Sequence, residues 1–233
     1  MHGKYRTMNN YDYIIWHINE SEVELRAQLE HPEYYADKVK NLKPGSKRLM
    51  EVLAVRCALK VLFNGEEQQV RYNEYGAPAL SDGTCISISH TSEYAAVCVS
   101  PHPVGIDIER IGNRVQRVVS KFLKEEELVV LQMETNQPDL ATISPFQGDM
   151  LTLALHLAWS AKEAIYKVLG HDYYDLKELV SLLHIDWQIK VLWLRVEGME
   201  RPWRVKFDYN ADYVFCLVLA KESESACQVF SIR

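Results

Sequence analysis

The sequence predicts an α+β fold made of two similar halves. Segments rich in good helix formers alternate with shorter apolar segments that have the residue pattern of strands. A faint internal repeat supports a duplication: VRCALKVLF (55–63) and KEAIYKVLG (162–170) share a Lys-Val-Leu ending. SEYAAVCV (92–99) and ADYVFCLV (211–218), which follow them, share an acid-Tyr start and an apolar strand. We therefore expect a pseudo-duplicated protein whose ligand site lies between the halves.

The composition and net charge of the chain restrict the classes of function that it can have. The chain has 233 residues, of which 48% are hydrophobic and 25% charged, as in ordinary globular proteins. Its net charge of −6 does not favour nucleic-acid binding. The N-terminus lacks an apolar signal core, no apolar run approaches membrane-spanning length, and the five cysteines contain no C-x-x-C. We expect a cytoplasmic monomer with reduced thiols that binds neither nucleic acid nor membranes.

The first half contains two predicted helices. The segment 11–18 is typical of a strand, and Ser21 with Glu24 forms a capping box that opens a short helix. Ser46 caps a longer helix, which ends at Asn64-Gly65. Further strands are predicted near 68–72, 85–89, 94–99 and 104–109.

The second half begins with a charged segment, 114–133, predicted to be a helix. The segment 134–149 has two prolines and a glycine and is predicted to be a loop. A long apolar helix follows at 151–169. The remaining elements are a short helix near 175–183 and strands near 184–196, 203–208, 212–220 and 227–232.

The long helix carries the stretch WSAKEAIYK at 159–167. At about 100° per residue, Trp159, Lys162, Glu163 and Lys167 share one face, and apolar residues occupy the opposite face. Such a face can be a solvated surface, because Glu163 and Lys167 form a stabilising i,i+4 pair. The alternative is that it supplies a carboxylate and two cations to a site, which needs the support of a second motif.

The second motif is GIDIE at 105–109. Strict alternation puts Ile106 and Ile108 on one side of a strand and Asp107 and Glu109 on the other. With a third carboxylate from a helix, this pair makes an oxygen site suited to Mg²⁺. A D-x-E pattern alone is more often a solvated strand face.

Together the two motifs resemble the 4′-phosphopantetheinyl transferases of the surfactin-synthetase-activating type. That family carries G-[IV]-D-[IV]-E and, about fifty residues on, W-[ST]-x-K-E-[AS]-x-x-K, and both patterns are unbroken here. A third stretch, ISISH at 86–90, is similar to the family's N-[IV]-S-H-[ST], with Ser87 in place of Asn. The resemblance extends from the helix near 47–63 to the strand near 212–220.

The resemblance implies an enzyme that transfers phosphopantetheine from coenzyme A to a carrier-protein serine, releasing 3′,5′-ADP with the help of Mg²⁺. It implies Asp107, Glu109 and Glu163 as metal ligands, with Glu163 alternatively the general base through a water. Lys167 and Lys162 are expected to face the phosphates. Asp107, Glu163 and Lys167 are the expected catalytic residues.

For the nucleotide end of coenzyme A, the resemblance implies Ser89 and His90, with His90 contacting a phosphate. Lys47 and Arg48 stand at a helix start, where an anion is favoured.

One position departs from the family pattern: Ala77 stands where the family usually has a Lys or Arg that contacts phosphate. Either Lys47, Arg48 or a lysine of 38–43 compensates, or coenzyme A binds more weakly. Arg56 is another candidate, and the alternative for it is an ion pair with a carboxylate.

The expected division assigns 1–109 to the nucleotide side and the Asp/Glu strand, and 110–233 to the WSAKEAIYK helix and the carrier protein. An acidic carrier needs a local basic patch on this acidic chain. The basic residues of the expected patch are Arg110, Arg114, Arg117, Lys121 and Lys124. From 114 onward they recur at spacings of three and four, which predicts one helical stripe. The alternative is a solvated face balanced by the three glutamates that follow.

Two other functions use the same residues. A metal-dependent hydrolase of nucleoside pyrophosphates would direct the carboxylates at water, and a non-catalytic homologue would only bind a carrier protein. The complete set of carboxylates and lysines argues against the latter.

Overall fold

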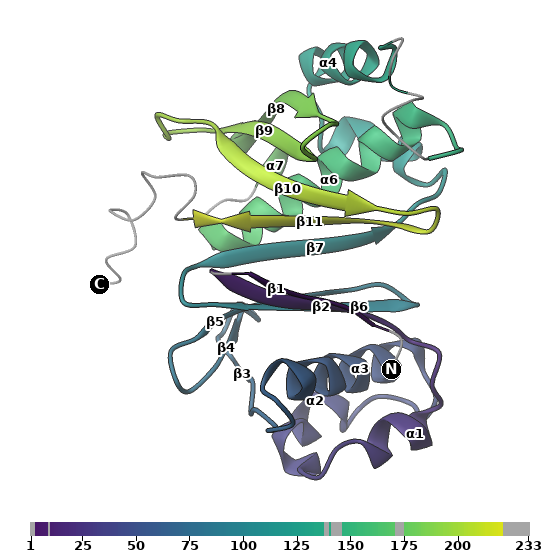
Figure 1. Cartoon of the computed structure of the whole chain (residues 1–233), viewed down its shortest axis with the longest axis vertical. Helices are drawn as coiled ribbons and strands as arrows, with labels where there is room; N and C mark the ends of the chain where they lie inside the picture. The colour runs from purple at the N-terminus through teal and green to yellow at the C-terminus, as the bar shows by residue number, and fades with distance from the viewer. Residues whose placement is uncertain (1–2, 9, 138–139, 141–145, 171–174, 221–233) are drawn as a thin grey trace. The chain divides into compact units, whose positions relative to one another are not determined.

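The computed structural model describes residues 3–8, 10–137, 140, 146–170 and 175–220. The chain forms two compact units, Met1–Val104 and Gly105–Arg233 (Figure 1). Each has its own hydrophobic core. Within the described ranges, no helix is long and apolar enough to cross a membrane.

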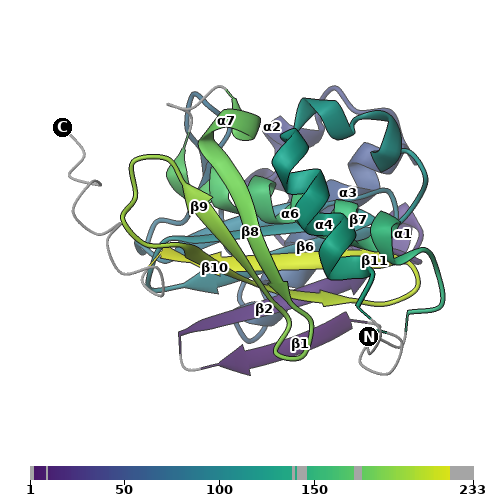
Figure 2. The ribbon, with the colours of Figure 1, turned by 90° about the horizontal axis from the view of Figure 1, so that it is seen from above.

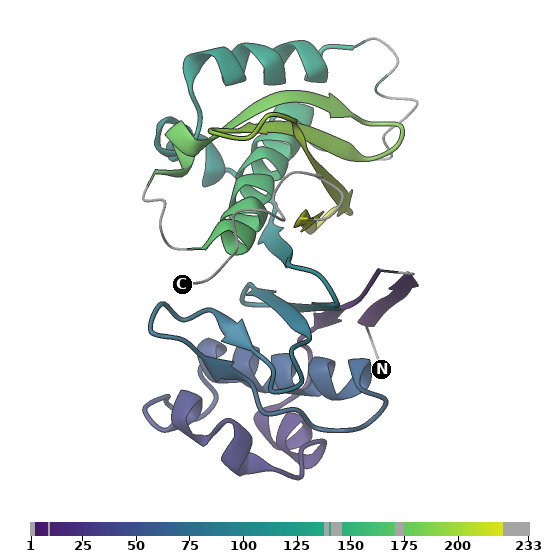
Figure 3. The same ribbon diagram turned by 90° about the vertical axis from the view of Figure 1, so that its left-hand side faces the viewer.

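The first unit is an antiparallel sheet covered by a long helix, α3 (Lys47–Leu62), which packs on β2 and β6 (Figure 3). The strand order is β1-β2-β6-β5. The strands of this sheet are β1 (Gly3–Met8), β2 (Tyr11–His17), β5 (Cys85–His90) and β6 (Tyr94–Ser100). The smaller elements are α1 (Glu22–Ala27), the 3₁₀ turn η1 (Pro32–Tyr34), α2 (Ala36–Val39), β3 (Arg71–Tyr72) and β4 (Pro78–Ala79).

The predicted caps are confirmed in this unit. Ser21 accepts a hydrogen bond from the backbone N–H of Glu24, and the Glu24 carboxylate accepts one in return. Ser46 accepts from Leu49 N and opens α3. Asn64 and Gly65 have φ values of 54° and 98°, the left-handed conformation that ends a helix. Strand β1 is an addition to the sequence prediction.

The second unit is a five-stranded sheet with order β7-β11-β10-β9-β8. Its long helix α6 (Met150–Leu169) packs on β11 and β10, and α4 (Glu125–Thr135) packs on β8 and α6 (Figure 3). The strands are β7 (Val104–Arg110), β8 (Val180–Asp186), β9 (Val191–Val196), β10 (Trp203–Tyr209) and β11 (Tyr213–Leu219). The short helical elements are η2 (Val115–Arg117), η3 (Val119–Lys121) and α7 (Leu176–Leu179).

Three details differ from the sequence prediction in this unit. The segment expected to be one helix from 114 to 133 forms two 3₁₀ turns before α4 begins at Glu125. Lys124 N donates to Glu127 Oε2 at 2.9 Å, which starts α4 as a separate helix. The basic residues before it therefore do not form one helical stripe.

The helix expected near 175–183 is confined to α7, because the chain enters β8 at Val180. The strand expected over 184–196 is a hairpin of β8 and β9, which run side by side in Figure 2. The strand expected at 227–232 and part of the loop expected at 134–149 lie outside the described residues.

Gly105 brings β7 close to α6. A Cβ at this position would lie 1.9 Å from the Ala164 carbonyl oxygen and 2.8 Å from Val168 Cγ2. Because helix backbone cannot yield like a flexible side chain, Gly105→Ala is expected to lower the free energy of unfolding by about 3 kcal/mol in urea titrations. Gly112→Ala is the control, since nothing lies within 4 Å of its Cβ position. Equal stability of the two variants would contradict the close approach.

Candidate active site

The carboxylates predicted on the GIDIE strand lie on β7, beside α6. Asp107 is 4% exposed and Glu109 is half-buried. Lys167 Nζ donates to Asp107 Oδ1 at 2.9 Å and to the carbonyl oxygen of Ile106 at 2.8 Å. Lys167 therefore offsets the charge of a carboxylate that has little contact with water.

Two further hydrogen bonds fasten α6 to the same strand. Trp159 Nε1 donates to Glu109 Oε1 at 3.2 Å, and Ser160 Oγ donates to the Asp107 carbonyl oxygen at 3.2 Å. Because Trp159, Glu163 and Lys167 recur at i, i+4 and i+8, they lie along one face of the helix. The structure thus brings the predicted residues Asp107, Glu109, Glu163 and Lys167 together within the second unit.

The three carboxylates influence one another. Burial, then the Asp107 charge, raises the pKa of Glu109 to about 7, and Trp159 and Lys167 oppose the shift. Burial and the Asp107 charge also raise the pKa of Glu163. Acidic oxygens that repel one another in a partly buried site fit a divalent cation, because its charge relieves the repulsion.

The described residues contain no group of three or more His, Cys, Asp or Glu side chains already close enough to hold a metal ion. The Lys167 ammonium lies against Asp107 instead. Magnesium ligation by Asp107, Glu109 and Glu163 stays a prediction whose support is the chemistry of the donor set.

Lys162 does not lie where the sequence analysis expects it. The side chain is completely buried, Nζ lies 2.8 Å from Glu127 Oε1, and it donates to the Phe122 carbonyl oxygen at 2.7 Å. Glu127 Oε1 also accepts from Leu182 N at 2.7 Å. Because the Lys162 ammonium forms this internal ion pair, the expectation that Lys162 faces phosphates is corrected.

A second set of candidate residues surrounds a pocket of about 170 Å³ in the first unit. Its basic lining residues are Lys38, Arg48, Arg56 and His90. The apolar and aromatic lining comes from Val52, Val55, Tyr72, Gly76, Pro78 and Ile88. Two predicted coenzyme A residues, Arg48 and His90, are thus brought together here.

Arg48 and His90 form a small network with Glu51. Arg48 Nη1 contacts His90 Nε2 and lies 3.1 Å from Glu51 Oε2. His90 Nδ1 also lies 3.1 Å from that carboxylate oxygen. The network holds the imidazole at the pocket wall.

Ser89 and Lys47, which the sequence analysis also places at the nucleotide end of coenzyme A, are outside the pocket lining. Ile88 and His90 share one face of β5, and Ser89, which is 7% exposed, points to the other. Lys47 is exposed at the first position of α3.

A larger groove, of about 640 Å³, lies in the second unit next to Glu109 and Trp159. Its basic residues are Arg110, Arg114 and Lys121, and its apolar lining comes from Ile111, Val115 and Val118. His156 links α6 to the backbone of Gly112 in the groove lining. Its Nε2 lies 2.9 Å from the Gly112 carbonyl oxygen and 3.0 Å from the Gly112 N. Burial lowers the pKa of His156, which favours its neutral form.

Sequence reasoning missed Glu127 and Tyr72. Glu127 follows two other glutamates, so the sequence gives no sign that it alone is buried. Tyr72 lies in a two-residue strand without a recognisable motif. Its hydroxyl accepts from Arg56 Nη2 at 3.3 Å.

Comparison with known proteins matches residues 103–218 to the 4′-phosphopantetheinyl transferase superfamily. The chain is 29% identical over 136 residues to the 4′-phosphopantetheinyl transferase gsp of Aneurinibacillus migulanus, covering 58% of this chain and 52% of that protein. It is 35% identical over 127 residues to enterobactin synthase component D of Salmonella typhimurium, covering 53% of this chain and 49% of that protein. The chain thus spans about half the length of these curated relatives.

Proposed function

Because this chain belongs to the 4′-phosphopantetheinyl transferase superfamily, we propose that it transfers the 4′-phosphopantetheine group of coenzyme A to a serine of an apo carrier protein, using Mg²⁺. The observation that carries the proposal is the cluster of Asp107, Glu109, Glu163 and Lys167 on β7 and α6. In the reaction, the serine oxygen bonds to the phosphorus that bears pantetheine. The bond from that phosphorus to the bridging oxygen breaks, and 3′,5′-ADP leaves.

Asp107, Glu109 and Glu163 would hold the magnesium ion, which supplies positive charge to the pyrophosphate oxygens. Lys167, already 2.9 Å from Asp107, adds a second positive charge on the same side of the site. Glu163 is the candidate base for the serine proton, since burial raises its pKa toward the range useful for accepting one.

The pocket of the first unit suits the nucleotide end of coenzyme A. Arg48 on α3 supplies hydrogen-bond donors, His90 on β5 lies at the pocket wall, and Lys38 adds a charge. Lys47 and Ser89 remain predicted contacts.

The basic groove of the second unit is the proposed docking site for the carrier protein, because the resemblance implies a carrier with an acidic helix beside its serine. Arg114→Glu combined with Lys121→Glu is expected to raise the KM for carrier about tenfold at low salt. The effect should shrink as salt screens the charges. Steady-state kinetics with each substrate varied in turn measures it, and the KM for coenzyme A should not change.

Arg195→Glu combined with Arg201→Glu is the matched control, because both residues are exposed in the same unit and outside the groove lining. An unchanged KM for carrier in the groove variant at low salt would mean that the carrier docks elsewhere.

The deciding experiment incubates purified protein with coenzyme A, Mg²⁺ and a panel of apo carrier proteins, followed by mass spectrometry. One added phosphopantetheine on serine supports transfer. Loss of coenzyme A without any carrier would instead support a pyrophosphate hydrolase, and binding of carrier without any reaction would support a non-catalytic homologue.

A further inference from the structure

One face of α6 carries polar side chains that bond, one after another, to the chain between β7 and η2. The four pairs are Lys167–Asp107, Trp159–Glu109, His156–Gly112 and Thr152–Gln116. Because the helix residues are spaced by eight, three and four, they lie on one face of α6 at about 100° per residue. The first two pairs belong to the carboxylate cluster, whereas the last two hold the segment that lines the groove.

Gly112 lies in the connection between β7 and η2, outside any helix or strand. His156 Nε2 is 3.0 Å from Gly112 N and 2.9 Å from the Gly112 carbonyl oxygen. His156 is 6% exposed, and its Nδ1 has no hydrogen-bond partner within the described residues. Burial lowers the pKa of His156, so the neutral ring bonds to the chain through Nε2. The contact with Gly112 is thus what satisfies this buried polar ring.

The position of Gly112 matters because basic residues of the groove stand on either side of it. Arg110 precedes it and Arg114 follows it, and both are exposed residues of the groove lining. An exposed arginine has many rotamers, so the position of its backbone decides which region its charge can reach. A shift of the backbone at Gly112 would therefore displace both charges relative to the apolar lining made by Val115 and Val118.

The backbone before and after this glycine is held by other contacts. Ile111 N donates to the Asp212 carbonyl oxygen at 2.8 Å. Gln116 Nε2 donates to Thr152 Oγ1 at 2.8 Å. His156 holds the stretch between these two anchors, so its loss should loosen that stretch without unfolding the unit.

We propose that His156 is a positioning residue for the carrier protein. Through Gly112 it holds the segment 110–114, so that the groove is already formed when the carrier arrives. A preformed surface has less conformational entropy to lose on association, and the hydrogen bond of His156 therefore raises the affinity for the carrier. The identity of the occupant rests on the proposed function, whereas the link between His156 and the groove rests on the hydrogen bonds of Gly112.

The test measures binding of a labelled apo carrier protein, the member of the panel that the wild type binds most tightly, by fluorescence anisotropy without coenzyme A or Mg²⁺. His156→Leu keeps a side chain of similar size but cannot bond to Gly112, and it should weaken binding about tenfold. His156→Gln puts an amide near the position of Nε2 and should restore binding to within about twofold of the wild type. His156→Asn puts its amide near the position of Nδ1 instead, and binding should stay weak.

Steady-state kinetics of transfer give a second measurement. His156→Leu should raise the KM for carrier by about the factor by which it weakens binding. The KM for coenzyme A and the kcat at saturating carrier should stay near the wild-type values, because the carboxylate cluster keeps its own hydrogen bonds to α6. A fall in kcat with an unchanged KM for carrier would contradict a positioning role.

Hydrogen exchange of the amides of residues 111–114, measured by NMR on the full chain without ligand, follows the segment directly. Exchange should be about tenfold faster in His156→Leu than in the wild type, and His156→Gln should restore it. His184→Leu is the matched control. His184 on β8 also links a strand to a helix of the same unit, with Nδ1 2.5 Å from Glu134 Oε1, and it lies outside the groove lining. This control should change neither the exchange nor carrier binding.

Thermal unfolding separates positioning from a role in the fold alone. If His156 only fills the core, the Leu and Gln variants should change the Tm but not the Kd for carrier, and that result would overturn the proposal. If His156→Leu does not fold, His156→Asn decides. Wild-type affinity of the folded Asn variant would count against positioning, and weak binding that Gln restores would support it.

The positioning role and the enzymatic function can fail separately. Carrier binding that depends on residue 156, without transfer to any carrier, supports positioning and contradicts the proposed function. Transfer by His156→Leu at the wild-type KM for carrier overturns positioning and leaves the function intact. Failure of the wild type to bind any carrier of the panel would overturn both the docking site and the role of His156 in it.

Discussion

Asp107→Ala is expected to lower the rate of the proposed phosphopantetheine transfer by about a thousandfold, because it removes a proposed ligand of the metal ion whose positive charge would offset that of the pyrophosphate. Asp107 is 4% exposed and accepts a hydrogen bond from Lys167 at 2.9 Å. Its loss leaves the ammonium with the Ile106 carbonyl and removes one proposed magnesium ligand. The measurement is the rate of carrier modification, followed by mass spectrometry at saturating coenzyme A.

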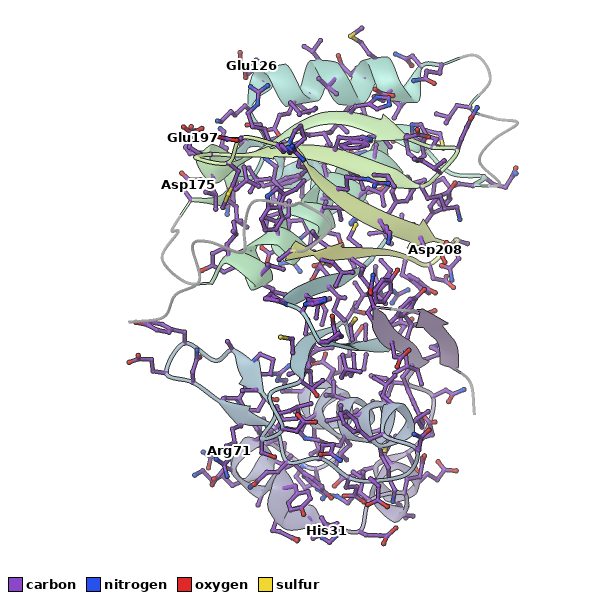
Figure 4. All side chains as sticks on the ribbon, turned by 60° about the vertical axis from the view of Figure 1, so that its left-hand side comes forward. His31, Arg71, Glu126, Asp175, Glu197 and Asp208 are labelled. Atoms are coloured by element: carbon purple, nitrogen blue, oxygen red, sulfur yellow. The ribbon has the colours of Figure 1, made fainter. Side chains whose placement is uncertain are left out.

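Asp208→Ala is a closely matched control for this variant. Asp208, labelled in Figure 4, also accepts from a lysine, Lys190 Nζ, at 2.9 Å, but it lies on β10 and outside the carboxylate cluster. We expect near-wild-type transfer from it. If Asp107→Ala also kept near-normal turnover at ordinary Mg²⁺ concentrations, the assignment of the β7 face would be wrong.

The second carboxylate variant, Glu163→Gln, separates two roles of Glu163. The substitution keeps shape and helix propensity but removes the charge and the base. If Glu163 accepts the serine proton, turnover should fall more than the affinity for coenzyme A measured by calorimetry with Mg²⁺ present. An equal loss of both would indicate that Glu163 is a metal ligand only.

The residues of the carboxylate cluster could be predicted from the sequence because local periodicity determines where they point. Alternation on β7 fixes the common side of Asp107 and Glu109, and helical spacing puts Glu163 and Lys167 on one face of α6. These rules need no knowledge of the rest of the chain. The pairing of β7 with β11 in the second unit, by contrast, depends on contacts distant in sequence.

Lys162 shows why the same rules can fail. Helical spacing gives the direction of the side chain but does not reveal what packs over it. Glu127, 35 residues earlier in the chain, covers that part of α6 and takes the ammonium. The prediction of one helix over 114–133 was wrong for a related reason. Apolar residues at helical spacing also suit two successive 3₁₀ turns, and these turns still leave Val115 and Phe122 buried.

Lys162→Ala is expected to destabilise the protein by about 3–5 kcal/mol, because it leaves the Glu127 carboxylate buried without a cation. Lys162 is completely buried, and Glu127 is 2% exposed. Backbone N–H groups of Lys124 and Leu182 donate to the carboxylate at 2.9 and 2.7 Å, but they carry no charge. Urea unfolding measures the loss, which is a large share of the stability of an ordinary domain.

A double variant decides whether the pair is structural or whether Lys162 acts on phosphate. Lys162→Met combined with Glu127→Gln removes both charges and keeps similar volumes, so it should recover much of the stability lost in Lys162→Ala. If the lysine serves only the internal pair, the double variant should also have a nearly normal KM for coenzyme A. A stable double variant that has lost coenzyme A binding would show instead that Lys162 leaves Glu127 during catalysis to contact the substrate.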